Sequence, residues 1–282
     1  MVRICNKREL NPTVVQMEIE APHIAAKAKP GQFIILRVSD DGERIPLTVA
    51  DCDTAKGTVT IIVQIVGATT AKLCKLNIGD YITDFVGPLG TPSKLDGLKK
   101  VAIVGGGVGC AIAYPLAKKL YNSGAVVHSI IGFRNKDLVI LEDEFRAVST
   151  ELFIGTDDGS YGPKGLVTDQ LKSLLDAGEQ YDEVIAIGPA IMMKFVCRLT
   201  KEYGVKTTIS MNTIMVDGTG MCGGCRLTVG GETKFACVDG PDFDGHLVDF
   251  DEVMKRQSMY TSFEKHAFDK ECNLISANAE VQ

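Results

Sequence analysis

The feature that most constrains the fold is a change in sequence pattern at Lys99. From there to residue 210, short β-branched and apolar runs alternate with longer runs that have helical spacing. Glycines and prolines separate the two kinds of run. Alternation of this kind predicts a parallel sheet with helices on both faces, so we expect an α/β domain over residues 99–210.

The first part of the chain, residues 1–98, predicts a different architecture. Its β-branched runs are separated by Gly, Asp and Pro and lie at 12–20, 33–40, 57–67 and 81–87. Only one short stretch, at 70–76, has helical spacing. Short strands divided by turns are typical of a small β-barrel. The expected fold class is therefore β plus α/β, with an N-terminal barrel followed by a parallel sheet.

Composition narrows the function classes. The net charge of −6, with no block of basic residues, argues against a nucleic-acid partner or an anionic membrane. Six of the nine cysteines are scattered without repeated spacing, which indicates a reducing cytoplasm rather than a disulfide framework. The N-terminus lacks the apolar core of a signal peptide. Glycines and a proline break the most apolar stretch, residues 101–117, so we expect no membrane span.

Near the C-terminus, Asp217, Cys222, Cys225 and Cys237 follow the spacing D-x4-C-x2-C-x11-C. Plant-type 2Fe–2S ferredoxins use C-x4-C-x2-C and a distant fourth cysteine. The spacing therefore predicts a 2Fe–2S cluster in which a carboxylate replaces the first thiolate. A small module over residues 211–250 would carry it, and such a cluster would move single electrons.

Two other interpretations of this loop remain open. CxxC with a third cysteine is also the spacing of a structural zinc site. The thiols could instead be free, with Asp217 an ordinary turn residue. If Asp217 only caps the turn, the fourth ligand of a metal would be water or a remote cysteine, Cys110 or Cys272.

Two motifs in the barrel segment suggest phosphate binding. Arg44 is suited to bidentate phosphate contact, and Thr48 could bond the edge of a flavin ring. Residues 66–70 place a glycine and hydroxyls at a helix start, which makes an anion site for a diphosphate. The alternatives are a surface arginine beside a proline turn and a simple helix cap.

Three segments in the α/β part of the chain suggest a nucleotide site. Residues 105–109, GGGVG, join a buried strand to a helix, where amides can face a phosphate. The third Gly of the full dinucleotide fingerprint falls at Cys110, and no acid ends the next strand, so a tight packing turn is the alternative. Residues 156–159 and 188–190 also end strands at the carboxyl edge where ligands bind, or are ordinary turns.

The order of these motifs is more specific than any one of them. RIPLT, VGATT, GPLG, GGGVG, TDDGSYGPKG, IGP and the cysteine loop resemble, in this order, the ferredoxin–NADP reductase superfamily. The layout is similar to that of its electron-transfer subunits with a C-terminal 2Fe–2S module. Over residues 1–260 it looks most like the small subunits of NADH-dependent reduced ferredoxin:NADP oxidoreductases.

This resemblance implies FAD, NAD(H) and a 2Fe–2S cluster. The implied FAD-binding residues are Arg44, Pro46, Leu47, Thr48, Gln64, Val66, Gly67, Thr69 and Thr70. The implied NAD(H)-binding residues are Gly105, Gly106, Gly107, Val108, Gly109, Asp157, Asp158, Gly188 and Pro189. Asp217, Cys222, Cys225 and Cys237 would ligate the cluster. Pro46 and Leu47 stand where the wider superfamily has an aromatic residue, and Ile187 replaces a cysteine of its C-G-P turn.

It also implies a role in a complex. The chain would be an oxidoreductase subunit that passes electrons to a larger flavin and iron–sulfur subunit handling NADPH and ferredoxin, in flavin-based electron bifurcation. Asp217 separates this hypothesis from the electron-transfer subunit of an NAD-dependent dihydroorotate dehydrogenase, which would have four cysteines. A zinc-bearing interaction module without redox activity is the hypothesis from another class.

The expected domains are an FAD-binding barrel over 1–98, an NAD(H)-binding domain over 99–210, the cluster module over 211–250, and a C-terminal helix and tail over 251–282. Apolar residues with helical spacing at 247–265 predict one helix. Because it follows the cluster loop, we expect this helix to pack on a partner subunit, and the alternative is a helix that packs on the chain's own core.

Overall fold

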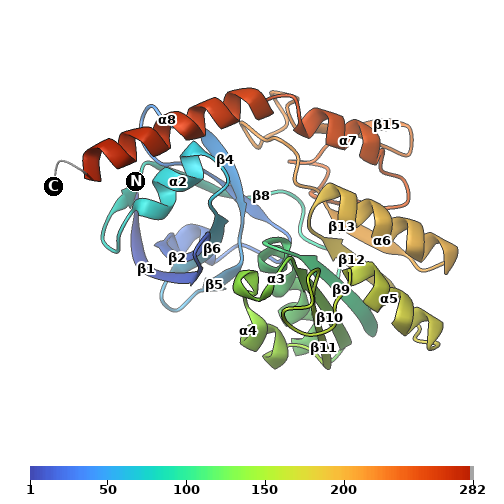
Figure 1. The fold of residues 1–282 in the computed structure, drawn as a ribbon. Helices are drawn as coiled ribbons and strands as arrows, with labels where there is room; N and C mark the ends of the chain where they lie inside the picture. Colours follow the sequence, from blue (N-terminus) through green and yellow to red (C-terminus); the bar gives the residue numbers. More distant parts are fainter. Residues whose placement is uncertain (280–282) are drawn as a thin grey trace.

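The computed structural model describes the backbone of residues 1–279 and the side chains of residues 1–270. A β-barrel lies beside an α/β domain, and the C-terminal helix runs back over the barrel (Figure 1). The expected fold class is confirmed. Within the described residues, no helix is long and apolar enough to cross a membrane.

The barrel is built from two antiparallel sheets, with strand orders β5-β6-β2-β1-β7 and β4-β3-β8. The strands are β1 (Val2–Asn11), β2 (Val14–Glu20), β3 (Phe33–Arg37), β4 (Arg44–Thr48), β5 (Asp51–Asp53), β6 (Thr58–Gln64), β7 (Tyr81–Ile82) and β8 (Asp84–Leu89). Its helices are α1 (Pro22–Ala25) and α2 (Ala68–Lys75). Alternate residues of β2, Val15, Met17 and Ile19, point into one apolar core, as strand periodicity requires.

The α/β domain has a six-stranded sheet of order β11-β10-β9-β12-β13-β16. The first five strands pair in parallel. They are β9 (Lys100–Gly106), β10 (Val126–Phe133), β11 (Glu151–Thr156), β12 (Glu183–Ile187) and β13 (Thr207–Ser210). The helices are α3 (Gly109–Asn122), α4 (Glu142–Ala147), α5 (Val167–Asp176) and α6 (Ala190–Glu202), with a 3-10 turn, η1 (Lys136–Leu138). Helices cover both faces, as the alternation predicted (Figure 1).

The cluster module is joined to that sheet. A hairpin, β14 (Arg226–Val229) and β15 (Glu232–Phe235), follows the cysteine loop, and β16 (Asp242–Asp244) then pairs antiparallel with β13. The third segment therefore completes the edge of the nucleotide-domain sheet, a partnership that the sequence pattern did not reveal.

Strand β3 is buried on both faces. Ile34 and Leu36 point into the barrel core. Phe33 and Ile35, on the opposite face, pack in a core that they share with the cluster module and α6. This strand is a common wall between the barrel and the module.

The expectation of one partner-facing helix over 247–265 is wrong. The segment forms two helices, α7 (Phe250–Gln257) and α8 (Thr261–Ala279). Phe250 and Val253 of α7 are buried in the chain's own core. Asp249 caps α7 by accepting a hydrogen bond from the Glu252 amide, and α8 runs back to pack on α2. Helical spacing reports an apolar face but not what covers it.

Candidate functional site

The two flavin motifs meet in the barrel. Residues 44–48 form β4 itself rather than the turn after a strand, and residues 66–70 form the turn into α2. The Thr69 hydroxyl donates to Glu43 Oε2 at 2.8 Å, which ties this turn to the start of β4. Arg44 is exposed beside that contact, and Pro46, Leu47 and Thr48 are half-buried along the strand, as is Gln64 at the end of β6.

Thr70 has a local role that the sequence left undecided. Its hydroxyl oxygen accepts hydrogen bonds from the amides of Val66 and Gly67, both at 3.0 Å, and its hydroxyl donates to the Gly67 carbonyl at 2.9 Å. Thr70 therefore holds the shape of the turn. A Cβ placed on Gly67 would meet nothing within 4 Å, so the space outside the turn is open to an approaching group.

The two nucleotide turns also lie together. A Cβ on Gly109 would stand 2.4 Å from the Ile187 carbonyl oxygen and 2.7 Å from Gly188 Cα. Only a glycine permits this approach of the turns that follow β9 and β12. The Gly107 amide donates to the Gly132 carbonyl at 2.9 Å, which holds the same turn against the end of β10. The amide-rich start of α3 thus lies at the carboxyl edge of the sheet.

The acids after β11 lie beside the end of the neighbouring strand. The Asp157 amide donates to the Phe133 carbonyl at 2.9 Å, and the Asp158 amide to the Arg134 carbonyl at 3.3 Å. Hydrogen bonds from Ser160 hold the pKa of Asp158 below its usual value. A dinucleotide fold normally places an acid at the end of the second strand, whereas the nearest acids here follow the third strand of the domain, β11. Sequence reasoning found these acids but not their neighbours.

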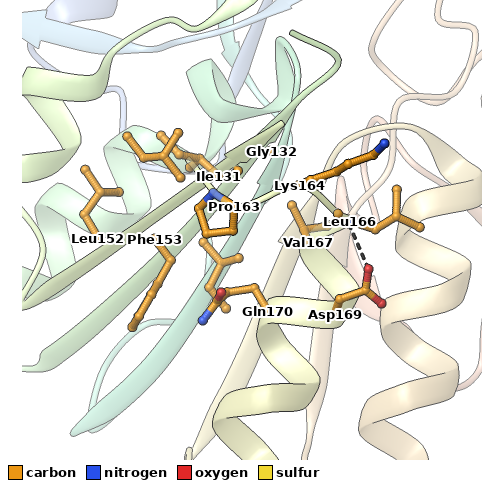
Figure 2. A pocket seen from close by; sticks show the side chains of 14 residues that line it. Ile131, Gly132, Leu152, Phe153, Pro163, Lys164, Leu166, Val167, Asp169 and Gln170 are labelled. Carbon is orange, nitrogen blue, oxygen red and sulfur yellow. Dashed lines mark hydrogen bonds between the residues drawn. The ribbon is translucent and has the colours of Figure 1, made fainter. Parts of the chain in front are cut away.

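A cavity of about 360 Å³ lies between β10, β11, the loop after β11 and the start of α5 (Figure 2). Apolar side chains such as Leu152, Phe153 and Val167 form most of its wall, with Gln170 at one side. None of the predicted site residues lines it. Pro163, Lys164 and Gly165 belong to the loop that carries Asp157 and Asp158, so the cavity lies beside that turn although the two acids do not line it.

The three cysteines of the predicted cluster site differ in burial. Cys225 and Cys237 are buried, and their sulfur atoms are 3.3 Å apart. Cys222 is exposed, and its sulfur accepts a hydrogen bond from the Gly224 amide at 3.4 Å. In the part of the chain with described side chains, no three His, Cys, Asp or Glu groups converge on one point. The four-residue ligand set therefore stays a prediction.

Asp217 is held by its own loop. Oδ1 accepts a hydrogen bond from the Thr219 hydroxyl at 2.5 Å, and Oδ2 accepts from the amides of Met221 at 3.2 Å and Cys222 at 3.4 Å. The Thr219 hydroxyl and these amides keep the pKa of Asp217 below its usual value. The carboxylate is thus ionised and curled toward the start of the CxxC pair.

The donor set fits an iron–sulfur cluster. Burial and the Cys225 thiol raise the pKa of Cys237 to about 12, and a bound metal would favour its thiolate form instead. Asp217, Cys222 and Cys225 on the loop and Cys237 just after β15 offer a carboxylate and three sulfurs, the number of protein ligands that a 2Fe–2S cluster takes. The remote candidate Cys110 is buried against Gly105 in another core. Cys272 lies outside the residues with described side chains.

The cysteine loop rests on the barrel. Gly218 has φ +79°, and a Cβ there would stand 2.9 Å from both Ile35 of β3 and Leu89 of β8. β3 pairs with β4, which carries the flavin motif, and β8 pairs with β3 on its other side. The cysteine loop therefore rests on the sheet that contains the predicted flavin motif.

Comparisons with known proteins agree with this geometry. Residues 212–249 match the model of the iron–sulfur cluster binding domain of dihydroorotate dehydrogenase B. Solved structures under 25% identical share the fold alone, among them a ferredoxin–NADP+ reductase from Plasmodium falciparum, 16% identical with a TM-score of 0.57 over 71% of this chain and 90% of that one. The chain thus has the fold of the ferredoxin–NADP reductases together with an iron–sulfur cluster binding domain.

Closer relatives place the chain in one family. It is 46% identical to the dihydroorotate dehydrogenase B electron transfer subunit homolog of Thermotoga maritima, over 95% of this chain and 94% of that protein. It is 35% identical to the electron transfer subunit of Streptococcus pneumoniae, over 86% and 95%. The chain belongs to the family of dihydroorotate dehydrogenase B electron transfer subunits and their homologues.

A solved structure is also similar. It is the structure of an NADH-dependent reduced ferredoxin–NADP oxidoreductase, described with flavin-based electron bifurcation, and it is 45% identical with a TM-score of 0.91 over 96% of this chain and 97% of that one. The resemblance predicted from the order of motifs is confirmed. FAD, NAD(H) and an iron–sulfur cluster are the cofactors of this fold and cluster domain, which favours iron over zinc in the cysteine loop.

Proposed function

We propose that this chain is the NAD(H)-linked electron-transfer subunit of an electron-bifurcating ferredoxin:NADP oxidoreductase. It would move electrons between NAD(H), FAD and a 2Fe–2S cluster to a partner subunit. The observation that carries the proposal is the contact of Gly218 with Ile35 and Leu89, because it rests the cysteine loop on the sheet in which we place the flavin motif. When bound, FAD would exchange a hydride with nicotinamide and single electrons with the cluster.

The residues of the chain would supply binding and orientation. Arg44 is exposed, and no described residue pairs with its side chain, which leaves its guanidinium available to the FAD diphosphate beside the open turn at Gly67. The glycine turn at 105–109 would hold the pyrophosphate of NAD(H) at the start of α3. Asp157 and Asp158 would bind ribose hydroxyls and repel the 2′-phosphate of NADP, which supports a preference for NAD(H).

An exposed apolar surface surrounds the cysteine loop. Met221, next to Cys222, is 88% exposed, and Val216 and Val238 are about half exposed. Clustered apolar side chains at a redox loop are typical of a protein interface. We infer that the partner subunit, the larger flavin and iron–sulfur subunit that handles NADPH and ferredoxin, covers this face. The eight cysteines with described side chains are all free, which supports a cytoplasmic location.

The second candidate is the electron-transfer subunit of an NAD-dependent dihydroorotate dehydrogenase, favoured by the names of several relatives. Asp217 favours the bifurcating enzyme over this candidate. By its resemblance to the cysteine motif, the subunit of the dihydroorotate enzyme would have a fourth cysteine in place of Asp217.

Anaerobic purification tests the proposal. The protein should contain about one FAD and about two iron atoms per chain, and NADH should reduce the flavin and then bleach the cluster. NADPH should be the poorer reductant, and Asp157→Ser should narrow that difference. Zinc without flavin would overturn the proposal. Transfer of electrons from dihydroorotate to NAD+ by the chain with its native partner would favour the second candidate instead.

A further inference from the structure

The barrel and the cluster module are joined by a seam outside the proposed binding residues. We define the exit segment as residues 90–95, which leave the barrel, and the cluster arm as residues 238–242, which follow Cys237. The Thr91 amide donates to the Gly240 carbonyl at 2.7 Å, and the Thr91 hydroxyl to the Val238 carbonyl at 3.1 Å. The Ser93 hydroxyl donates to Asp242 Oδ2 at 2.5 Å.

Two acids, Asp239 and Asp242, lie in the cluster arm. Asp239 is exposed and accepts a hydrogen bond from the Phe235 amide at 2.6 Å, whereas Asp242 faces the exit segment and has no cation partner among the described residues. Its Oδ1 is shut off from solvent and has no hydrogen-bond partner among the described residues, although the residue as a whole is half-buried. No described ion pair reaches it. Leaving a buried carboxylate ionised without a cation is costly, and such a group takes up a proton instead.

The charged groups around Asp242 do not neutralise it. Glu183 of β12 is buried, and it binds Lys206 at 2.8 Å and the Thr208 hydroxyl. Lys206 is therefore committed to Glu183. Asp244, on the same strand as Asp242, accepts a hydrogen bond from the His246 amide at 2.9 Å and adds a second negative charge.

Together, these surroundings raise the pKa of Asp242. Burial raises the pKa of Asp242 by more than the hydroxyls of Ser93 and Ser210 lower it, and the charge of Glu183 raises it further. The neutral acid also places its own proton in the seam, so that it can share a hydrogen bond with Ser93 in either direction.

We propose that Asp242 is a positioning residue that, as the neutral protonated acid, fastens the cluster arm to the exit segment. Through this link it keeps Cys237 in register with the barrel. Ionisation of Asp242 would put an unpaired charge into the seam and loosen the link. The electron-transfer consequence rests on the proposed function, whereas the protonation state does not.

Protein stability gives the first test. An acid whose pKa is raised on folding binds more protons folded than unfolded, so stability falls as pH rises from the unfolded value of about 3.9 toward the folded one. Asp242→Asn resembles the neutral acid and lacks this loss. Its stability relative to wild type, measured by denaturant unfolding of the full holoprotein, should therefore increase steadily over that range.

Thr91→Val is the matched control, because it breaks the same seam without removing an acid. Its difference from wild type should stay constant with pH. A constant difference for Asp242→Asn would overturn the proposal. An infrared band of a protonated carboxyl, present in wild type and absent in Asp242→Asn, is the expected spectroscopic signature, and its absence from wild type at neutral pH would also overturn it.

Rapid-reaction kinetics test the positioning role. In Asp242→Ala, NADH should reduce the flavin at the wild-type rate, while cluster reduction becomes roughly tenfold to a hundredfold slower because the geometry is lost. Asp242→Asn should restore cluster reduction. Equal cluster reduction in wild type and Asp242→Ala would refute the positioning role. If NADH fails to reduce the flavin in wild type, the proposed function is lost, and the stability test still decides the protonation state.

Discussion

The carboxyl edge of the α/β domain and the cysteine loop differ in how their sites are built. At the sheet edge, Gly109 packs against the Ile187 carbonyl and the Gly107 amide bonds to the end of β10. Backbone contacts fix the position of these glycine turns. In the cysteine loop, Cys225 and Cys237 lie close together, while Cys222 is exposed and Asp217 bonds to its own loop. Side chains must make that site.

This difference shows which part of a redox chain the fold preorganises. A nucleotide contributes its own shape, and the protein needs only a rigid edge with free amides. A cluster is bound through deprotonated side chains, so cluster binding is coupled to deprotonation and ordering of the residues that ligate it. Substitutions in the cysteine loop should therefore lower iron content and leave FAD bound, whereas substitutions at the sheet edge should slow the reaction with NADH and leave iron content unchanged.

The largest effect is expected at the cysteine loop. Cys225→Ser should remove nearly all iron and the cluster absorbance, because a hydroxyl is a poor substitute for a thiolate ligand. FAD should remain bound. Cys197→Ser, which changes a buried cysteine of α6, is the control and should keep full iron. Iron determination and the visible spectrum of anaerobic protein measure both, and a full cluster in Cys225→Ser would remove this residue from the ligand set.

A methyl group at the sheet edge should act on the nucleotide alone. Gly109→Ala forces a Cβ into the Ile187 carbonyl, and overpacking of this kind costs about 1–3 kcal/mol of stability. Displacement of the turn should slow NADH-dependent flavin reduction by about tenfold or more, with iron content unchanged. Stopped-flow flavin reduction and denaturant unfolding are the measurements. Wild-type kinetics would mean that this turn does not bind the nucleotide.

Asp217 gives an intermediate effect that sharpens the comparison. Asp217→Ala should leave a labile cluster, because one of four ligands is lost. Asp217→Cys should keep the cluster but shift its potential and spectrum, since a thiolate is a softer ligand than a carboxylate. Redox titration with spectroscopy measures this series. An unchanged cluster in Asp217→Ala would show that the carboxylate is not a ligand.

The smallest effect is expected at Gly67. The same Gly→Ala change meets nothing within 4 Å here, so the free energy of unfolding should change by no more than about 0.5 kcal/mol. The new methyl group projects into the space outside the turn, where we place the FAD diphosphate. FAD affinity, measured by flavin release in dilution or ultrafiltration, should weaken a few-fold. If Gly67→Ala bound FAD with the affinity of wild type, the diphosphate would not bind at this turn.

Local pattern was sufficient for most of the elements. The strand–helix alternation after Lys99 predicted β9 to α6 because each element carries its own periodicity and its own stop signal, such as Gly178 after α5. The site turns were predictable for the same reason, since each lies between a strand and a helix.

Contacts between distant segments could not be predicted in this way. The sequence of β16 does not show that this strand pairs with β13. The hydrogen bond between the exit segment and the cluster arm is equally invisible in the sequence. The helical spacing after residue 247 was recognised, but its partner was assigned wrongly, because Phe250 and Val253 fill the chain's own core. Asp157 was found as a residue, whereas its place beside Phe133 depends on the fold.

The two-sided burial of β3 has a consequence for anyone who recombines such proteins. Because Ile34 and Phe33 are buried in different cores on opposite faces of β3, neither face of the strand is exposed to solvent. Exchanging the iron–sulfur module for another would strip the cover from Phe33 and Ile35, and excising it would also expose the β13 edge. The three segments look like interchangeable parts along the chain, yet a working chimera would need β3 redesigned together with the module that it faces.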